Sequence, residues 1–190
     1  MVSSGESRPT RGELHVAPAL TPTAVRGMRT AAALFGAAAD APPLVMRTAE
    51  SLAQAPGQAC LVSLVGPAGG ELGPVAVAHA EARHTRALRR IVGHARRVAA
   101  DAFSRTVQRT GGALCLSITR PRQLRLWLPE AYWSYAERRA VHGVLAVALR
   151  RRRRVVGTLL LWREADQPGF DEADQAYVVE LAGRVALGLG

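Results

Sequence analysis

The stretch VALRRRRRVVGTLLLW, from Val147 to Trp162, places five consecutive arginines between two apolar runs. Each apolar run has the length and the valine and leucine content that are typical of a buried strand. A short polar segment between two such runs is typical of a hairpin turn. The sequence therefore predicts two antiparallel strands, Val144–Leu149 and Val155–Trp162, joined by Arg150–Arg154.

The length and composition indicate one globular domain that is not inserted in a membrane. A chain of 190 residues with 48% hydrophobic residues can bury a full core. Its apolar runs are too short to span a bilayer, and the first residues, MVSSGESRPTRGELH, lack the apolar core of a secretion signal. We expect a cytoplasmic protein without membrane contact.

The formal net charge of +10 suggests an acidic partner such as nucleic acid. However, all 25 basic residues are arginine, and lysine is absent. This bias, together with the abundance of alanine and glycine, is typical of a GC-rich genome, so part of the charge has a mutational origin. The charge allows a nucleic-acid partner but does not favour one.

The rest of the chain adds helices and further strands around the hairpin. Residues 1–22 are rich in Ser, Gly, Pro and Thr and are expected to be disordered, whereas residues 23–190 are expected to form a single domain. Hydrophobic spacing predicts helices over residues 23–39, 43–54, 82–102, 130–143 and 171–189, and strands over residues 59–65, 75–79 and 113–118. This order favours an antiparallel sheet with helices packed on it, an α+β fold.

Three local signals refine this outline. The alternation in PRQLRLWLP, residues 121–129, indicates a short extra strand or an extended loop. Gly143 is suited to cap the end of the helix at 130–143. Asp171 is suited to cap the start of the last helix.

The segment from Val141 to Leu189 resembles the C-terminal half of a GAF domain. A strand leads through a polar turn to a V-x-G-x-L-x-L pattern, and an F-x-x-x-D pattern opens the final helix. These patterns fall on Val155, Gly157, Leu159, Leu161, Phe170 and Asp174. The likeness covers about residues 24–190 and is loosest between Ala80 and Ala140.

The resemblance implies a GAF-like α+β fold with a five- to six-stranded antiparallel sheet and helices on both faces. It also implies that the N- and C-terminal helices pack together, and that the domain regulates rather than catalyses. The signatures of cofactor-binding members are missing. The chain has neither Lys nor Asn for a cyclic-nucleotide signature, and its cysteines and His142 do not match bilin, haem or sulfoxide-reductase patterns. We expect no cofactor.

The segment WLPEAYWSY holds four of the nine aromatic residues. The family layout places it at the mouth of the ligand pocket, where aromatic rings with polar tips suit a flat ligand. The alternative is a hydrophobic plug that closes an empty pocket. The candidate pocket residues are Cys115, Ser117, Trp127, Tyr132, Trp133, Tyr135 and His142.

Two groups of arginines are candidates for contact with an anionic partner, although each also suits a solvated surface. One group lies on the predicted helix at 82–102, and the other is the hairpin turn. They comprise Arg83, Arg86, Arg90, Arg97, Arg150, Arg151, Arg152, Arg153 and Arg154. Residues 164–180 hold six of the fifteen acids, so basic and acidic faces could also pair between subunits.

The sequence gives no support for catalysis or for a metal site. Cys60 and Cys115 lie in apolar runs and are expected to be buried free thiols. Neither the cysteines nor the five histidines show metal-ligand spacing, and no nucleophile elbow, phosphate loop or acid pair is present. We expect a protein that is not an enzyme.

Two functional hypotheses follow. The first is a regulatory, sensory GAF-like domain that binds an unknown small molecule, or dimerises through Thr23–Ala39 and the final helix, or does both. It would relay a signal to an attached or separate effector domain in bacterial signal transduction or transcription control. The second is a ligand-free GAF-like scaffold that binds a protein partner or nucleic acid through its arginine-rich surface. A pocket filled by its own side chains would favour the second hypothesis.

Overall fold

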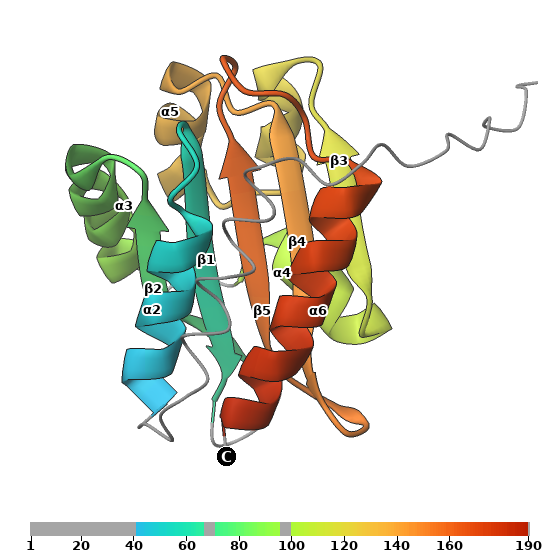
Figure 1. The fold of residues 1–190 in the computed structure, drawn as a ribbon. Coiled ribbons are helices and arrows are strands. Elements are labelled where there is room, and N and C mark those ends of the chain that lie inside the picture. Colours follow the sequence, from blue (N-terminus) through green and yellow to red (C-terminus); the bar gives the residue numbers. More distant parts are fainter. Residues whose placement is uncertain (1–40, 67–70, 96–99, 190) are drawn as a thin grey trace, which may run out of the picture.

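A five-stranded antiparallel sheet forms the centre of the computed structural model, which describes residues 41–66, 71–95 and 100–189 (Figure 1). The strand order is β2-β1-β5-β4-β3. The strands are β1 (Gln58–Val65), β2 (Leu72–His79), β3 (Ala113–Ser117), β4 (Gly143–Arg151) and β5 (Arg154–Arg163). The predicted α+β fold and the antiparallel sheet are confirmed.

Helices cover both faces of this sheet, as predicted (Figure 1). One face carries α2 (Ala41–Leu52) and α6 (Glu172–Gly188), and the other carries α3 (Ala82–Ala95), α4 (Ala102–Thr110), the 3-10 helix η1 (Pro121–Leu126) and α5 (Glu130–Arg138). No helix among the described residues is long and apolar enough to cross a membrane.

The first and last described helices approach each other closely. A Cβ atom at Gly188 of α6 would lie 2.7 Å from Leu44 Cδ2 of α2. The expected helix at Thr23–Ala39 and the expected disorder of residues 1–22 lie outside the described residues.

Helices bury the sheet on both faces. Since neighbouring side chains of a strand point in opposite directions, each central strand contributes side chains to both cores. On β5, Leu160 and Trp162 pack beneath α3, α4 and α5, while Leu159 and Leu161 pack beneath α2 and α6. All four side chains are at most 2% exposed. Two separate hydrophobic cores therefore share the same central strand.

The hairpin between β4 and β5 is also confirmed, with longer strands than expected. Arg151 pairs with Arg154, so the turn proper consists of Arg152 and Arg153 only. The register shifts between Leu149 and Arg150, which indicates a β-bulge just before the tip.

The single helix expected over residues 82–102 is not continuous: the described part of α3 is Ala82–Ala95, residues 100 and 101 are not helical, and α4 begins at Ala102. Asp101 starts the new helix: its Oδ1 accepts a hydrogen bond from Ser104 N at 2.7 Å. A carboxylate that binds free N–H groups favours a helix start over a helix interior. The apolar spacing continued across this point and concealed the break.

Two other local expectations were wrong. Residues 121–126 form the 3-10 helix η1, with Pro121 at its first position, where the missing N–H is tolerated. The helix α5 ends at Arg138, and Ala140 adopts a positive φ of 45°, so Gly143 begins β4 instead of capping the helix. The cap at Asp171 is confirmed, since its side chain accepts a hydrogen bond from Asp174 N at 2.7 Å.

Gly157 provides a test of this packing, because a Cβ atom there would lie 2.4 Å from the Ser63 carbonyl oxygen of the neighbouring strand. We expect Gly157→Ala to lower the free energy of unfolding by about 2–3 kcal/mol, as measured by denaturant titration. The control is Gly93→Ala on α3, where nothing lies within 4 Å of the added atom. That variant should be neutral or up to about 1 kcal/mol more stable. Equal stability of the two variants would contradict the close approach of β1 and β5.

Candidate functional site

Two tyrosines of the aromatic segment lie in the core between α5 and the sheet. The Tyr132 ring contacts Trp162 edge-on at 5.6 Å between centroids, and the Tyr135 centroid lies 6.3 Å from the same indole. The side chains of Tyr132, Tyr135 and Phe103 are all buried, as is Trp162. These rings fill the space beneath the helices, which corresponds to the plug rather than to an open pocket.

The two tryptophans of the segment are half-buried at its rim. Trp127 stacks on Phe103 with centroids 4.7 Å apart and ring planes 13° apart. Trp133 donates from Nε1 to the Leu128 carbonyl oxygen at 2.8 Å, and the Arg125 guanidinium lies 5.1 Å from its ring. All four aromatic residues of the segment are thus engaged within the protein.

The other three candidate residues lie elsewhere. Cys115 and Ser117 are on β3 and point toward the α6 face, where Cys115 Sγ lies 3.7 Å from the Phe170 carbonyl oxygen. His142 precedes β4, and its Nδ1 is buried without a hydrogen-bond partner among the described residues. The structure therefore does not bring the seven candidate residues into one pocket.

Some polar atoms of the aromatic core lack a partner. Tyr135 Oη and Trp162 Nε1 are buried and make no hydrogen bond to the described residues. Burial raises the pKa of Tyr135, so its hydroxyl keeps its proton. Buried polar groups are usually satisfied, often by an ordered water. Water, or a small polar ligand, could satisfy these two atoms.

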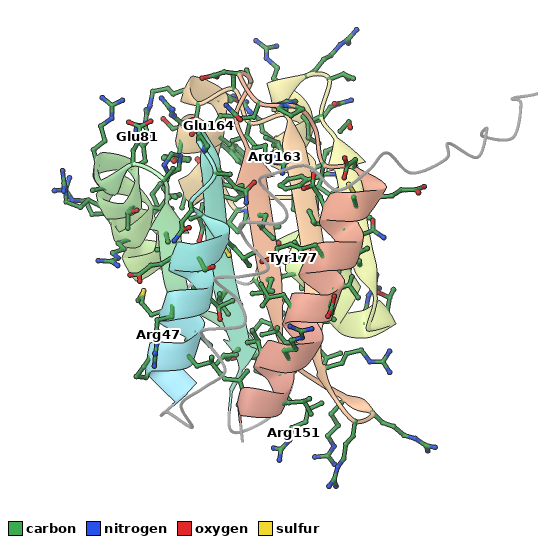
Figure 2. The ribbon with its side chains drawn as sticks, in the orientation of Figure 1. Arg47, Glu81, Arg151, Arg163, Glu164 and Tyr177 are labelled. Carbon is green, nitrogen blue, oxygen red and sulfur yellow. The ribbon has the colours of Figure 1, made fainter. Side chains whose placement is uncertain are left out.

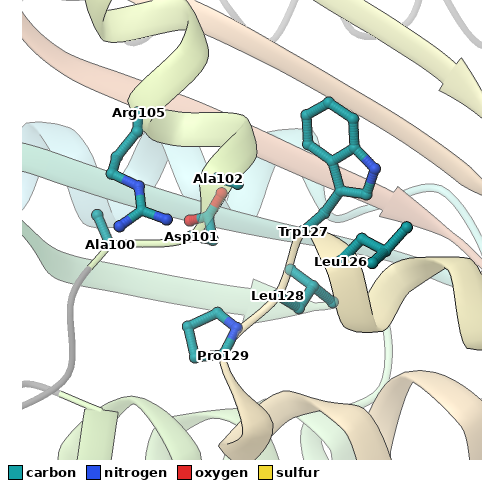
Figure 3. A pocket seen from close by; sticks show the side chains of 8 residues that line it. All are labelled: Ala100, Asp101, Ala102, Arg105, Leu126, Trp127, Leu128 and Pro129. Carbon is teal, nitrogen blue, oxygen red and sulfur yellow. The ribbon is translucent and has the colours of Figure 1, made fainter.

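An open pocket of about 200 Å³ lies between the start of α4 and the end of η1 (Figure 3). Arg105 and Asp101 lie on one side of it and Trp127 and Leu126 on the other. The lining residues are Ala100, Asp101, Ala102, Arg105, Leu126, Trp127, Leu128 and Pro129. We call this the rim pocket, and Trp127 is the only residue of the predicted set that lines it.

The two charged side chains of the rim pocket differ in their availability to a ligand. Asp101 is already engaged, since both carboxylate oxygens accept hydrogen bonds from Ser104. Burial raises the pKa of Asp101, although the bonds from Ser104 oppose this shift. Arg105 is exposed. A ligand here would meet an apolar wall and one accessible guanidinium.

A buried ionic network, which the sequence analysis missed, lies at one end of the sheet. Glu164 directly follows β5 and is 2% exposed. Arg139, which follows α5, donates to both of its carboxylate oxygens, and His79 Nε2 lies 3.1 Å from Oε1. These three residues come from distant parts of the chain, so no local spacing could have indicated their contact.

The donor atoms of His79, His84 and Glu164 lie within 4.8 Å of one another, a geometry that could hold a metal ion. However, His79 Nδ1 accepts a hydrogen bond from Glu81 N at 2.9 Å, so Nε2 must carry the proton that faces Glu164. A metal at Nε2 would break this arrangement and would lie beside the Arg139 cation. The hydrogen bonds fit an ion-pair network better than a metal site.

The arginines proposed for an anionic partner form two exposed groups. On α3, Arg83 and Arg86 are exposed, and Arg83 pairs with Glu81 at 2.6 Å. Arg90 is exposed but has contacts within the chain, and Arg97 lies outside the described residues.

In the hairpin, Arg150 donates to the Gly111 carbonyl oxygen at 3.4 Å. Arg151–Arg154 are exposed, and Arg151 lies at the opposite end of the molecule from Glu164 (Figure 2).

Half of the acids in the acidic segment are neutralised by the protein's own arginines. Three of the six acids between residues 164 and 180 form ion pairs: Glu164 with Arg139, Asp174 with Arg163, and Glu180 with Arg184. The other three, Asp166, Asp171 and Glu172, are exposed and form no ion pair with the described residues, so pairing with the arginines of another subunit would depend on them.

Comparison with known proteins identifies the fold class. No family model matches the sequence, and no curated protein matches it. Solved GAF domains do match the structure, so the chain has a GAF-domain fold. The GAF domain of the phosphoenolpyruvate-protein phosphotransferase from Coxiella burnetii gives a TM-score of 0.64 at 15% identity, over 88% of this chain and 92% of that one. Its Acinetobacter counterpart gives 0.62 at 13%, over 90% and 94%.

The fold is shared with enzymes as well. The free methionine-R-sulfoxide reductase from Neisseria meningitidis, in complex with its substrate, gives a TM-score of 0.60 at 15% identity, over 92% of this chain and 95% of that one. At such identities the likeness concerns the fold alone, and function has to be argued from this chain's own residues.

The network around Glu164 should be structurally important. Glu164→Ala would leave Arg139 and His79 without their buried acceptor, so we expect it to lower the free energy of unfolding by about 3 kcal/mol. Glu180→Ala removes an exposed pair with Arg184 and should cost less than about 1 kcal/mol. Denaturant titration of both variants measures the difference. If both variants lost the same free energy of unfolding, the contacts of Glu164 with His79 and Arg139 would not stabilise the packing of β2, α5 and β5.

Proposed function

We propose that this chain is a bacterial regulatory domain of the GAF fold that acts as an interaction scaffold. The observation that carries this proposal is the filled space beneath α4 and α5. Phe103, Tyr132, Tyr135 and Trp162 occupy it with buried side chains, which leaves little room for a ligand there. The domain would pass a signal from its partner to an attached or separate effector.

The chemistry of the two cysteines supports a role without catalysis. Burial raises the pKa of the Cys60 thiol. Burial also raises the pKa of the Cys115 thiol, and the nearby Asp174 carboxylate adds to this effect. Thiols react as thiolates, so both groups are poor nucleophiles at neutral pH. This argues against thiol chemistry of its own.

A second candidate function is small-molecule sensing at the rim pocket. Its volume of about 200 Å³ is below the range of roughly 300–1,000 Å³ that is typical of sites for drug-sized ligands. A smaller anionic molecule would fit the accessible guanidinium of Arg105 and the apolar wall formed by Leu126 and Trp127. The rim pocket is the specific observation that favours this alternative.

Native mass spectrometry of the purified, untagged protein separates the two candidates. The scaffold proposal predicts the mass of the chain alone or of its oligomer, with no adduct. A reproducible excess mass that is lost on denaturation would contradict it and would favour sensing. The double variant Arg105→Ala, Trp127→Ala should then lose the adduct, whereas the exposed control Arg122→Ala should keep it.

We further propose that the domain forms a homodimer through α6. Val179 and Leu187 are 44% and 71% exposed, and with Gly183 they recur every four residues along one side of the helix. The interface would thus combine two apolar side chains with a small residue that allows close approach. A second copy of the chain would cover this stripe.

The dimer proposal can be tested by size-exclusion chromatography with light scattering. The native protein should run as a dimer at micromolar concentration, and Val179→Glu with Leu187→Glu should convert it to a monomer. The matched control is Val75→Glu on β2, an apolar residue of similar exposure (40%) in a different part of the fold. A monomeric native protein, or a dimer that survives the α6 variant, would contradict the proposed interface.

A further inference from the structure

The tip of the β4–β5 hairpin concentrates four cations that the fold itself does not use. Arg151, Arg152, Arg153 and Arg154 are all exposed, and none forms an ion pair or side-chain hydrogen bond with another described residue. Arg150 differs from them, because its guanidinium packs against Gly111 at the end of α4. The unused charge therefore begins at Arg151.

The tip is locally unfavourable in two ways. Arg151 and Arg154 are direct cross-strand partners, and like charges in such a position repel each other. Arg152 adopts a φ of +54°, a conformation that favours glycine or asparagine. No described contact compensates for either penalty. Local conflicts of this kind are typical of functional sites, where stability is given up for binding.

The shape of the tip fits a polyanion with a groove. The hairpin is a narrow two-stranded ribbon at the same end of the molecule as the C-terminal end of α6 (Figure 1), and Arg151 lies at that end (Figure 2). A two-stranded ribbon can enter the major groove of a B-form DNA duplex, and a guanidinium can bind a phosphate through two hydrogen bonds. The tip has no apolar side chain that could anchor it in a lipid bilayer.

The protein's own acids are poor substitutes for such a partner. The acidic end of α6 lies at the opposite end of the molecule from the hairpin (Figure 1), and Asp174 there is already paired with Arg163. The exposed carboxylates without an ion pair, such as Glu50, Glu71 and Glu130, are spread over the described part of the chain, so a second copy offers no cluster of acids that matches the four guanidiniums of the tip.

We infer that the Arg151–Arg154 hairpin is a phosphate-binding element for duplex nucleic acid. This inference rests on the scaffold function proposed above and names one partner for it. The tip contains no aromatic ring to stack on bases and no Asn, Gln or acid to read base edges. Its contacts are therefore to phosphates and independent of sequence.

The test is the salt dependence of binding to a fluorescent DNA duplex of about 20 base pairs and arbitrary sequence, followed by fluorescence anisotropy. The tip variant carries Arg151→Gln, Arg152→Gln, Arg153→Gln and Arg154→Gln. The control variant removes four exposed arginines elsewhere: Arg86→Gln, Arg89→Gln, Arg122→Gln and Arg138→Gln. Both variants have the same net charge, so only the place of the charge differs.

The native protein should bind the duplex with an affinity that falls steeply with salt. The tip variant should bind at least about 30-fold more weakly at low salt, and its slope of log affinity against log salt should be shallower by about 3 to 4. The control variant should change the affinity less than about threefold. Equal losses in both variants would mean that net charge alone drives binding, and would overturn the inference.

Two further measurements separate the failure of this inference from that of the scaffold proposal. The tip variant should unfold at an equal or higher temperature than the native protein, since it relieves the cross-strand repulsion, so a loss of binding is not a loss of fold. Vesicles with and without phosphatidylserine form the second arm. Tip-dependent binding to the anionic vesicles, without binding to the duplex, would overturn the nucleic-acid assignment but retain a scaffold role. A bound small molecule in native mass spectrometry would instead contradict the scaffold proposal itself.

Discussion

The burial of β5 on both faces is the constraint on which the rest of the structure depends. This strand pairs with β1 on one side and β4 on the other, and its side chains alternate between two hydrophobic cores. Gly157 has room only for hydrogen, because a Cβ atom there would lie 2.4 Å from the Ser63 carbonyl oxygen of the neighbouring strand β1. A one-residue shift in its register would move each of its side chains into the opposite hydrophobic core and would place a larger residue than Gly157 beside Ser63. Both of its ends are therefore held at fixed positions.

The charged residues at the two ends of β5 differ in how many partners they have in the surrounding structure. At the C-terminal end, Arg163 binds Asp174 and Gln58, and Glu164 binds Arg139 and His79. At the N-terminal end, the arginines of the hairpin have almost no partners. Exposed arginines without an ion pair also lie elsewhere in the described part of the chain, for example Arg86 and Arg122, but only at the hairpin do four of them follow one another. This contrast is the main argument that the hairpin binds something outside the fold.

The sequence predicted those parts of the structure that depend on local pattern. The strands followed from uninterrupted apolar runs, and the start of α6 followed from the capping residue Asp171. The break between α3 and α4 was missed because Asp101 is a cap placed inside a continuing apolar pattern. The ionic network was missed for a different reason: His79, Arg139 and Glu164 are brought together only by the packing of β2, α5 and β5.

The packing of the candidate ligand site likewise could not be predicted from local sequence pattern. Spacing could place Tyr132 and Tyr135 on a helix, but it could not show whether their rings face an empty pocket or the core. The deciding partner is Trp162, whose side chain reaches the same space from the opposite layer. A small residue at that position would have left the two tyrosines facing a cavity. The filling of the pocket is thus a tertiary property of β5, not of the aromatic segment.

The packed aromatic core on one face of the sheet and the unpaired arginines at the hairpin tip are physically compatible. Filling the space beneath the helices makes the sheet a rigid support, and a binding element on a rigid support loses less conformational entropy when it binds. The arginine side chains at the tip are held by a backbone whose register is fixed by Leu149, Gly157 and Leu159 below it. The same region of β4 packs against α6, the helix that we propose as the dimer interface. Contact at the tip and the proposed pairing of two copies would therefore act on the same hydrophobic core, the one between the sheet and α6, with no need for a ligand in the pocket.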